Sequence, residues 1–301
     1  MYGFGRDAEN VVEASKEIAH ISYHIVMLHV FTIASDQEKT VLLRTTAEWS
    51  KLNIEIIPWN HWNGFTDKIY AMKQVLEFVP DEDIVAFVDA YDVLCMSNET
   101  EIMEKFFSYD CEIVLSSEVN CYPGENQSAY DQIVNTTAYK YVNSGGYIGY
   151  ARALRQMFVW KTDQEIEDIC SLGGDQHFFT QYYLHHYDEM SSNVSSHHIK
   201  GGLVCLDEFQ RIFQSLYKVP LRCFVFLEGR LYNHSLKTYP CFVHFNGFHD
   251  YRREIIHNET GECVPAMQQF IENMKKSLKW GSAAMEHHLP ELDCSVYELC
   301  T

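Results

Sequence analysis

The chain has 301 residues, of which 47% are hydrophobic, and it carries a formal net charge of −19. This length and apolar content fit one large α/β domain or two modest ones, and we expect one domain followed by a tail. The acidic charge and the lack of any block of Lys and Arg argue against a nucleic-acid-binding surface, so an anionic small ligand would need a metal or a few placed cations.

Strands and helices are expected to alternate through the first half of the chain. The strands are expected over residues 23–34, 52–59, 84–88 and 111–116, and helices over residues 66–79 and 99–107. A further helix should follow the first strand, because Ser35 and Glu38 form an S-x-x-E capping box. A polar loop is expected over 121–135. This alternation predicts an α/β fold with a Rossmann-like, mainly parallel sheet flanked by helices.

The second half is less regular. Gly145 and Gly146 interrupt a strand-like segment over 141–151, where the missing side chains would let a ligand or another backbone come close. Gly173 and Gly174 should break a helical region, and Asp175 begins the part that follows. Helices are expected over residues 151–169 and 175–187, and strands over residues 222–227 and 241–245. Residues 251–301 are expected to form one amphipathic helix followed by a polar tail.

Two aspartates, Asp89 and Asp92, follow the buried strand that starts at Ile84, with Tyr91 between them. In open α/β sheets ligands bind at the carboxyl ends of the strands. A carboxylate pair there is costly unless a cation or a proton offsets it. The pair therefore indicates a divalent-metal site, while a structural or helix-capping aspartate pair is the competing interpretation.

Several separated segments together resemble one known family. They are FVDAYDV (87–93), YVNSGGYIG (141–149), LDEFQRIFQ (206–214), and the stretch from GDQHFF (174–179) to HFNG (244–247). They are similar to the glycosyltransferase domain of procollagen lysyl hydroxylases and to collagen hydroxylysine glycosyltransferases, including forms carried by giant viruses. The likeness spans about 26–250. It implies a GT-A fold over 1–250, with a nucleotide-binding half at about 20–120, an acceptor half at about 121–250, and 251–301 packed on the same domain.

The resemblance also implies a reaction. The family binds a UDP-sugar with Mn²⁺ and transfers the sugar to hydroxylysine, or to galactose already on hydroxylysine, in collagen-like peptides. We expect a hexosyltransferase that prefers glucose, with galactose as the second choice. The alternative is a catalytically idle GT-A-like module that binds UDP-sugar or collagen.

By this resemblance Asp89, Asp92 and His244 bind the metal, and their mixed oxygen and imidazole donors suit Mn²⁺ better than Mg²⁺ or Ca²⁺. The ion would offset the charge that the departing diphosphate gains. Asp89 would also lie near the ribose, and Tyr91 would stack on uracil. The expected UDP-sugar-binding residues are Thr32, Lys68, Asp89, Tyr91, Gly145, Asn246 and Gly247. A strand-end threonine, a solvated helix lysine and a core histidine are the structural alternatives for Thr32, Lys68 and His244.

The expected catalytic and acceptor residues are Asp175, Asn143 and Glu118, with Tyr122 as an aromatic neighbour of Glu118. An N-cap role is the alternative for Asp175. The chain departs from the family pattern at two points. Gly174 replaces an aspartate often found before Asp175, and Asp250, followed by Arg252 and Arg253, stands where a phosphate-contacting lysine is usual. These departures are the main support for the idle module.

Targeting signals are weak. The first twenty residues lack the apolar core of a signal peptide, and no apolar run approaches the roughly 20 residues that span a bilayer. We expect a cytoplasmic protein, of the host cell if viral, or a protein of the endoplasmic reticulum lumen whose leader was removed. The ten cysteines include no CxxC pair, which excludes the common zinc and thioredoxin-type motifs. The oligomeric state stays open, with a homodimer as one option.

Overall fold

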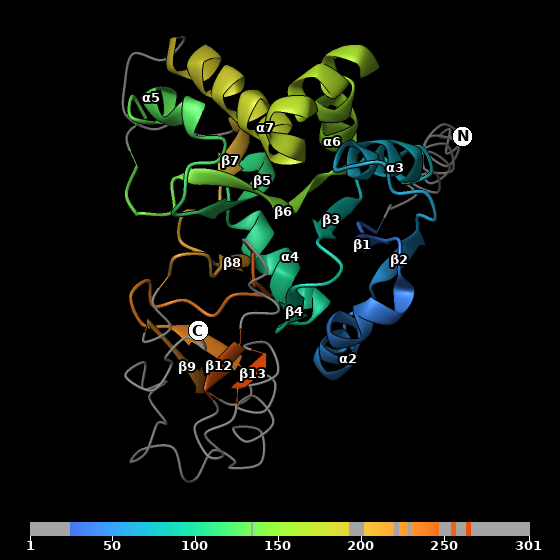
Figure 1. The fold of residues 1–301 in the computed structure, drawn as a ribbon, viewed down its shortest axis with the longest axis vertical. Helices are drawn as coiled ribbons and strands as arrows, with labels where there is room; N and C mark the ends of the chain where they lie inside the picture. Colours follow the sequence, from blue (N-terminus) through green and yellow to red (C-terminus); the bar gives the residue numbers. More distant parts are fainter. Residues whose placement is uncertain are drawn as a thin grey trace, which may run out of the picture.

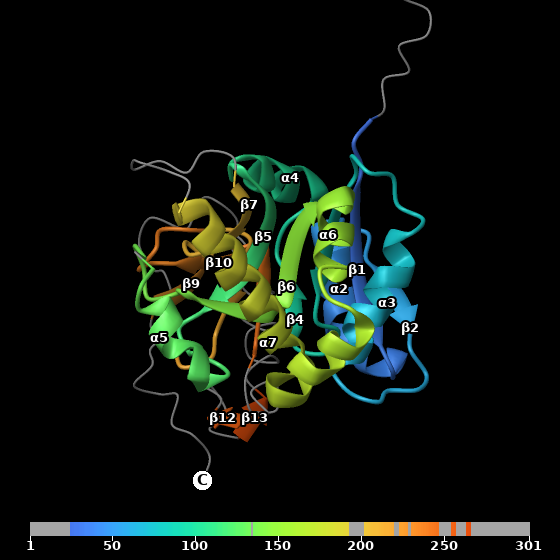
Figure 2. The same ribbon diagram turned by 90° about the horizontal axis from the view of Figure 1, so that it is seen from above.

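The structure is a computed structural model that describes residues 25–133, 135–192, 202–219, 223–227, 230–246, 254–256 and 263–265. Its centre is a six-stranded sheet with helices on both faces (Figures 1 and 2). The strand order is β2 (Glu55–Pro58), β1 (Leu28–Ala34), β3 (Ile84–Val88), β6 (Tyr141–Tyr150), β5 (Cys111–Glu118) and β7 (Gly202–Leu206). The expected α/β fold with a mainly parallel sheet is confirmed, since β1 pairs in parallel with β2 and β3, and β5 with β7.

Strand β6 departs from the predicted parallel pattern, because it runs antiparallel to both of its neighbours, β3 and β5. A parallel return from β5 would need a crossover over the face of the sheet. The connection from Glu118 to Tyr141 instead stays at the carboxyl end of β5, holding only the 3₁₀ helix η2 (Gly124–Asn126) and the short helix α5 (Gln127–Tyr130). As a result, the first residues of β6 lie at the edge where β3 ends, and Gly146 is opposite Val88.

The helices cover the sheet in two layers. One face carries α3 (Thr66–Leu76), α6 (Ala151–Phe158) and α7 (Asp163–Ser192), and the other carries α2 (Val41–Ser50) and α4 (Glu99–Phe107). The buried strand β3 serves both layers, because successive side chains point to opposite faces. Val85 and Phe87 pack under the α3, α6 and α7 layer, whereas Ile84, Ala86 and Val88 pack under α2 and α4.

The helix starts differ from the sequence prediction at two places. The prediction of a Ser35–Glu38 capping box is wrong. Asp36 instead accepts a hydrogen bond from the Glu38 N–H and caps the 3₁₀ helix η1 (Gln37–Thr40). The α-helix α2 begins only at Val41. The long helix expected over 151–169 is two helices, because Thr162 and Glu165 form a reciprocal capping box that starts α7.

The predicted break at the second glycine pair is confirmed. Helix α7 leaves helical geometry at Gly173 and at Gly174, whose φ is +66° and ψ −165°. That region of backbone space is essentially restricted to glycine. The helix resumes at Asp175, as expected, so that the carboxylate of Asp175 lies at the start of a helical segment.

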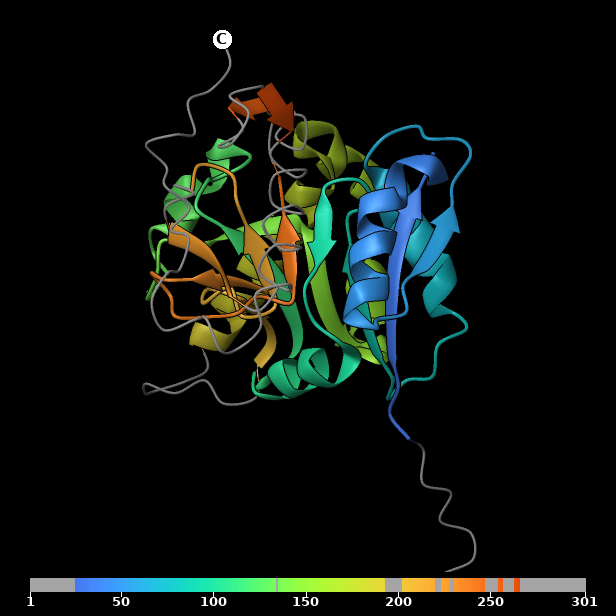
Figure 3. The same cartoon turned by 90° about the horizontal axis from the view of Figure 1, so that it is seen from below.

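A second, smaller sheet is visible from below (Figure 3). It consists of β4 (Val93–Cys95), β11 (Phe242–His244) and β8 (Phe213–Ser215), in that order. The pairs β9 (Phe224–Leu227) with β10 (Arg230–Asn233), and β12 (Glu254–Ile256) with β13 (Cys263–Pro265), are antiparallel. The expected late strands over 222–227 and 241–245 correspond to β9 and β11, although residue 222 lies outside the described residues.

The C-terminal region is described only in part. Residues 266–301, which contain the apolar face predicted for an amphipathic helix, lie outside the described residues, so the division at residue 250 stays a prediction. A disulfide joins Cys111 of β5 to Cys205 of β7, with the two Cα atoms 6.3 Å apart. Among the described residues, no helix is long and apolar enough to cross a membrane.

Candidate active site

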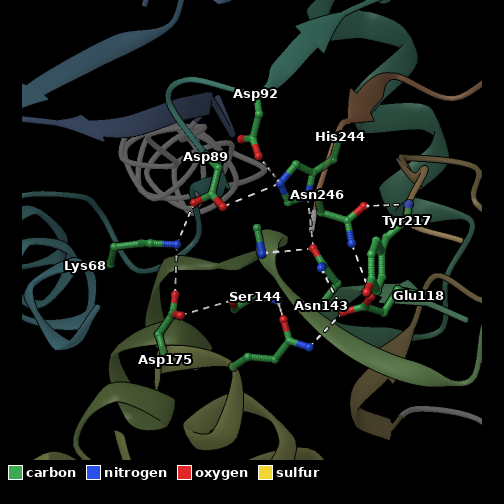
Figure 4. Close-up of polar contacts among 12 residues, drawn as sticks. Lys68, Asp89, Asp92, Glu118, Asn143, Ser144, Asp175, Tyr217, His244 and Asn246 are labelled. Atoms are coloured by element: carbon green, nitrogen blue, oxygen red, sulfur yellow. Dashed lines mark hydrogen bonds and ion pairs between the residues drawn. The ribbon is translucent and has the colours of Figure 1, made fainter. Parts of the chain in front are cut away.

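The two aspartates and the histidine predicted as metal ligands come together between the two sheets (Figure 4). Asp89 directly follows β3, Asp92 directly precedes β4, and His244 ends β11, where it is opposite Val93. His244 Nε2 lies 3.6 Å from Asp89 Oδ2 and 3.3 Å from Asp92 Oδ2. One donor atom from each residue lies within 4.8 Å of the others. Residues far apart in sequence thus form one compact donor group.

Gly145 makes room for this group. Its backbone N–H donates to Asn143 Oδ1 and its carbonyl accepts from the Asp89 N–H, which places it directly beside the ligands. A Cβ at this position would lie 2.0 Å from His244 Cε1 and 2.9 Å from Asp89 Oδ2. A Cβ at Gly146 would lie 2.6 Å from the ring of Phe213. The glycine pair therefore lets side chains of the small sheet approach β6, in addition to any role toward a ligand.

The orientation of His244 suits a metal ligand. Asn143 donates through Nδ2 to Glu118, so its Oδ1 is the acceptor that lies 3.1 Å from His244 Nδ1. This arrangement assigns the ring proton to Nδ1 and leaves the lone pair of Nε2 facing the aspartates. Two carboxylates and one imidazole in this arrangement fit a divalent cation of the transition series.

The charges around His244 are consistent with that fit. Burial of the ring alone would lower the pKa of His244, but the carboxylates of Asp92 and Asp89 outweigh it and raise this pKa above its ordinary value. The carboxylate side chains are partly exposed, at 23% for Asp89 and 20% for Asp92, whereas the histidine is buried. The three proposed ligands are therefore anchored by a buried histidine, and their carboxylates are accessible from the cavity.

Lys68, on the first turn of α3, bridges two of the predicted site carboxylates (Figure 4). Its Nζ lies 2.7 Å from Asp89 Oδ1 and 3.0 Å from Asp175 Oδ2. Burial would lower the pKa of Lys68, but Asp175 and Asp89 raise it, so the ammonium stays charged. Asp175 Oδ1 also accepts from Ser144 Oγ at 3.2 Å. Asp175 is thus tied to the metal-ligand group through one buried cation.

Glu118, at the end of β5, is held by three side-chain amides. Asn143 and Gln176 donate to Oε1 at 3.1 and 2.8 Å, and Asn246 donates to Oε2 at 3.2 Å. Burial raises the pKa of Glu118, and these donors and the nearby His244 act in the opposite direction. Asn246 Oδ1 in turn accepts from the backbone N–H of Leu216 and Tyr217. The Glu118 carboxylate therefore has a fixed position.

All these groups border one cavity of about 410 Å³. Nine of the predicted site residues line it: Lys68, Asp89, Asp92, Glu118, Asn143, Gly145, Asp175, His244 and Asn246. Tyr122 lines it as well, as expected for an aromatic neighbour of Glu118. The cavity is large enough for part of a nucleotide sugar, and its size is typical of small-molecule sites.

Two predicted nucleotide contacts lie elsewhere in the described structure. Thr32 is fully buried within β1, and its Oγ1 has no hydrogen-bond partner among the described residues. Tyr91 Oη accepts from the Asp36 N–H at 2.9 Å and lies 3.1 Å from Ser35 Oγ, which fixes the tyrosine against the end of β1. Neither residue lines the cavity. Their contacts with uracil stay predictions.

Gly247 and the segment with Asp250, Arg252 and Arg253 lie outside the described residues. The other departure from the family pattern has a structural basis. An aspartate at position 174 would need the left-handed backbone conformation that Gly174 adopts, and its Cβ would lie 3.3 Å from the ring of Phe65. In this structure an aspartate at position 174 would therefore strain the backbone and press on the ring of Phe65.

Sequence reasoning missed several residues that line the cavity. They are Phe65, Asn120, Ser144, Gln176 and Tyr217. Ser144 and Gln176 are the immediate neighbours of predicted residues, so their positions were accessible from the same motifs. Tyr217 follows the LDEFQRIFQ segment closely. Phe65 had no signal, since an apolar residue before a helix is ordinarily read as packing.

Comparison with known proteins identifies the family of the chain. A family model described as the PLOD GT domain matches residues 26–265. The chain belongs to this family of glycosyltransferase domains. Membership bears out the resemblance seen in the sequence motifs.

Individual relatives are distant. The chain is 30% identical to an uncharacterized protein, R699, of Acanthamoeba polyphaga mimivirus, over 63% of this chain and 38% of that protein. It is also 30% identical to the human multifunctional procollagen lysine hydroxylase and glycosyltransferase LH3, over 61% of this chain and 23% of LH3. The chain thus spans well under half the length of these relatives. Among solved structures, the galactosyltransferase LgtC with donor and acceptor sugar analogs matches 83% of this chain and 96% of LgtC at 16% identity, with a TM-score of 0.46.

Proposed function

We propose that this domain transfers a hexose from a UDP-sugar to hydroxylysine, or to galactosyl-hydroxylysine, in a collagen-like polypeptide, with Mn²⁺ as cofactor and glucose as the preferred sugar. The observation that carries the proposal is the convergence of Asp89, Asp92 and His244 on the cavity that also contains Lys68 and Asp175. Family membership and the relationship to LH3, whose name includes both hydroxylase and glycosyltransferase, support the reaction class and the acceptor.

The donor side of the reaction needs positive charge. Asp89, Asp92 and His244 would hold Mn²⁺, and the ion supplies the charge that stabilises a departing diphosphate. Lys68 adds a fixed ammonium beside Asp89, and because its pKa is raised it does not lose this charge at neutral pH. Transition-state charge is stabilised most effectively by such preorganised groups, since they need no reorganisation during the reaction.

The acceptor side needs a group that orients a hydroxyl. Glu118 is fixed by Asn143, Gln176 and Asn246, so the carboxylate is preorganised to accept a hydrogen bond from a sugar or hydroxylysine hydroxyl. Asp175, which is buried and paired with Lys68, would contact the hydroxyls of the transferred sugar. These roles make Asp175 and Glu118 the proposed catalytic residues. Asn143, which the sequence also suggested as catalytic, would act by positioning Glu118 and His244.

A binding module without turnover is the second candidate. The observation in its favour is the conformation of Gly174, in which the aspartate expected from the family pattern would be strained. In that case the cavity would bind UDP-sugar without transfer. The two functions differ in turnover and agree in ligand binding, so a single set of assays separates them.

The test uses the purified chain with Mn²⁺, UDP-glucose or UDP-galactose, and a peptide that carries galactosyl-hydroxylysine. Release of UDP together with a mass gain of one hexose on the peptide is the expected result. Asp92→Ala should lower the rate about 100-fold or more, because it removes a ligand of the ion that offsets the leaving charge. The matched control is Asp168→Ala, on the exposed surface of α7, which should leave the rate unchanged.

Three results would each contradict a different part of the proposal. Near-normal turnover of the Asp92 variant would contradict the metal assignment. Tight UDP binding without turnover, for either donor, would favour the binding module. Absence of UDP binding in the presence of Mn²⁺ would contradict both functions.

A further inference from the structure

Phe65 is an exposed aromatic residue of the cavity, which is otherwise lined by polar side chains, the tyrosines Tyr122 and Tyr217, and glycines. It directly precedes α3, lines the cavity and keeps 56% of its surface exposed. Single exposed apolar side chains are common on protein surfaces. The relevant observation is that Phe65 borders a cavity together with groups that can bind a polar ligand. Phe65 is not part of any motif that defines the family resemblance.

The ring is held in place by three neighbours. A Cβ on Gly174 would lie 3.3 Å from Phe65 Cδ2, so the ring packs directly over the glycine backbone. The ring of Trp62 meets it edge-on, with centroids 5.9 Å apart. Lys68 Nζ lies 5.5 Å from its centroid. The side chain is therefore fixed by its contacts while more than half of its surface remains free.

The position of the ring relates it to the donor. Lys68 follows Phe65 by three residues, and its ammonium joins Asp89, a proposed metal ligand, to Asp175. Phe65 and the proposed metal ligands line the same cavity, so a sugar attached to a diphosphate at those ligands would share the cavity that Phe65 borders. A hexopyranose presents both hydroxyl groups, which suit Asp175, and a face of C–H groups, which suits the negative face of an aromatic ring.

We propose that Phe65 is a stacking platform for the hexose ring of the nucleotide sugar. This inference rests on the proposed function, which it deepens by assigning a sugar-binding residue. Stacking on Phe65 contributes to the affinity for the hexose and not to the affinity for the UDP part. Gly174 is the complementary feature, because its missing side chain allows the ring to lie there.

The chain offers a matched control for this residue. Phe78, beyond the C-terminal end of α3, is 86% exposed and does not line the described cavity. Removing the ring of Phe78 changes exposed aromatic surface to a similar extent without touching the site. Phe65→Leu retains an apolar side chain against Trp62 and Gly174, which limits effects on folding, and Phe65→Tyr retains the ring.

The experiment measures dissociation constants for UDP, UDP-glucose and UDP-galactose by isothermal titration calorimetry in the presence of Mn²⁺. In wild type, the hexose should increase affinity over that of UDP. In Phe65→Leu, affinity for the preferred UDP-hexose should fall about 3- to 10-fold, the range of an aromatic stacking contact, with UDP affinity unchanged. Phe65→Tyr and Phe78→Leu should both behave as wild type.

Several outcomes would overturn the platform. They are an unchanged UDP-hexose affinity in Phe65→Leu, an equal loss of UDP and UDP-hexose affinity, and a wild type that binds UDP and UDP-hexose equally. A loss in Phe65→Tyr equal to that in Phe65→Leu would also contradict stacking. Failure of the proposed transferase is distinguishable, because it appears as an absence of turnover in the transfer assay, while the affinities for UDP and UDP-hexose can still be compared. A wild type that binds no UDP in the presence of Mn²⁺ would overturn the inference together with both functions.

Discussion

Substitution of Gly145 by alanine tests the proposed metal site by displacing its ligands, above all His244 and to a smaller extent Asp89. The added Cβ would lie 2.0 Å from His244 Cε1, whereas ordinary contact begins at 3.4 Å. The imidazole must therefore move by at least 1.4 Å, the difference between the two distances. Metal–ligand distances tolerate only about 0.2 Å. Since perturbing the support of a ligand typically costs 10- to 100-fold in metal affinity, we expect a loss of about 100-fold for Mn²⁺.

The measurement is Mn²⁺ binding by calorimetry, with the free ion checked by electron paramagnetic resonance. Gly124→Ala is the control, because a Cβ there would meet no atom within 4 Å, and it should bind Mn²⁺ as wild type does. Circular dichroism should show that both variants are folded. A Gly145→Ala protein that is folded and binds Mn²⁺ within twofold of wild type would refute the argument that His244 is a ligand in the position described.

Three other predictions follow from the charges and hydrogen bonds. Because the aspartates raise the pKa of His244, a proton on this histidine competes with the metal. The affinity for Mn²⁺ should therefore rise about tenfold per pH unit below that pKa. The same Mn²⁺ affinity at three pH values would contradict this prediction. Lys68→Met leaves the buried Asp175 without its cation and should lower the free energy of unfolding, measured in urea, by about 3 kcal/mol. Lys73→Met, which breaks an ion pair at the surface, should lower it by less than about 1 kcal/mol. Asp207→Asn should cost about 2 kcal/mol, since the carboxylate accepts from three backbone N–H groups of the following turn, and an unchanged denaturation midpoint would contradict this.

Local signals in the sequence were sufficient for much of the fold. Apolar runs and helical periodicity gave the strands and helices around the buried strand that ends at Val88, and the Gly173–Gly174 break was visible because glycine tolerates the backbone conformation found there. The convergence of Asp89, Asp92 and His244 came from the family resemblance. Periodicity alone did not place His244 next to the aspartates, since it ends a strand about 150 residues further along the chain.

What the sequence did not reveal depends on tertiary contacts. The direction of β6 follows from the route of the connection after Glu118, which no local pattern encodes. Whether Ser35 or Asp36 caps the first turn is a choice between adjacent polar residues, and Ser35 Oγ instead lies beside the hydroxyl of Tyr91. The role of Phe65 depends on the empty space over Gly174, on a helix about 110 residues away in sequence.

Charge explains why the site should depend on a metal. Four carboxylates line the cavity, from Asp89, Asp92, Glu118 and Asp175, and Lys68 is the lysine that faces them among the described lining residues. A nucleotide diphosphate would bring further negative charge into this cavity, on a chain whose net charge is already −19. Lys68 alone leaves the cavity negative, and its ammonium is already shared between Asp89 and Asp175. A divalent cation at Asp89, Asp92 and His244 would bring two more positive charges to the point where the diphosphate must bind. The acidic ligand group would thus favour nucleotide binding only together with the cation that it holds.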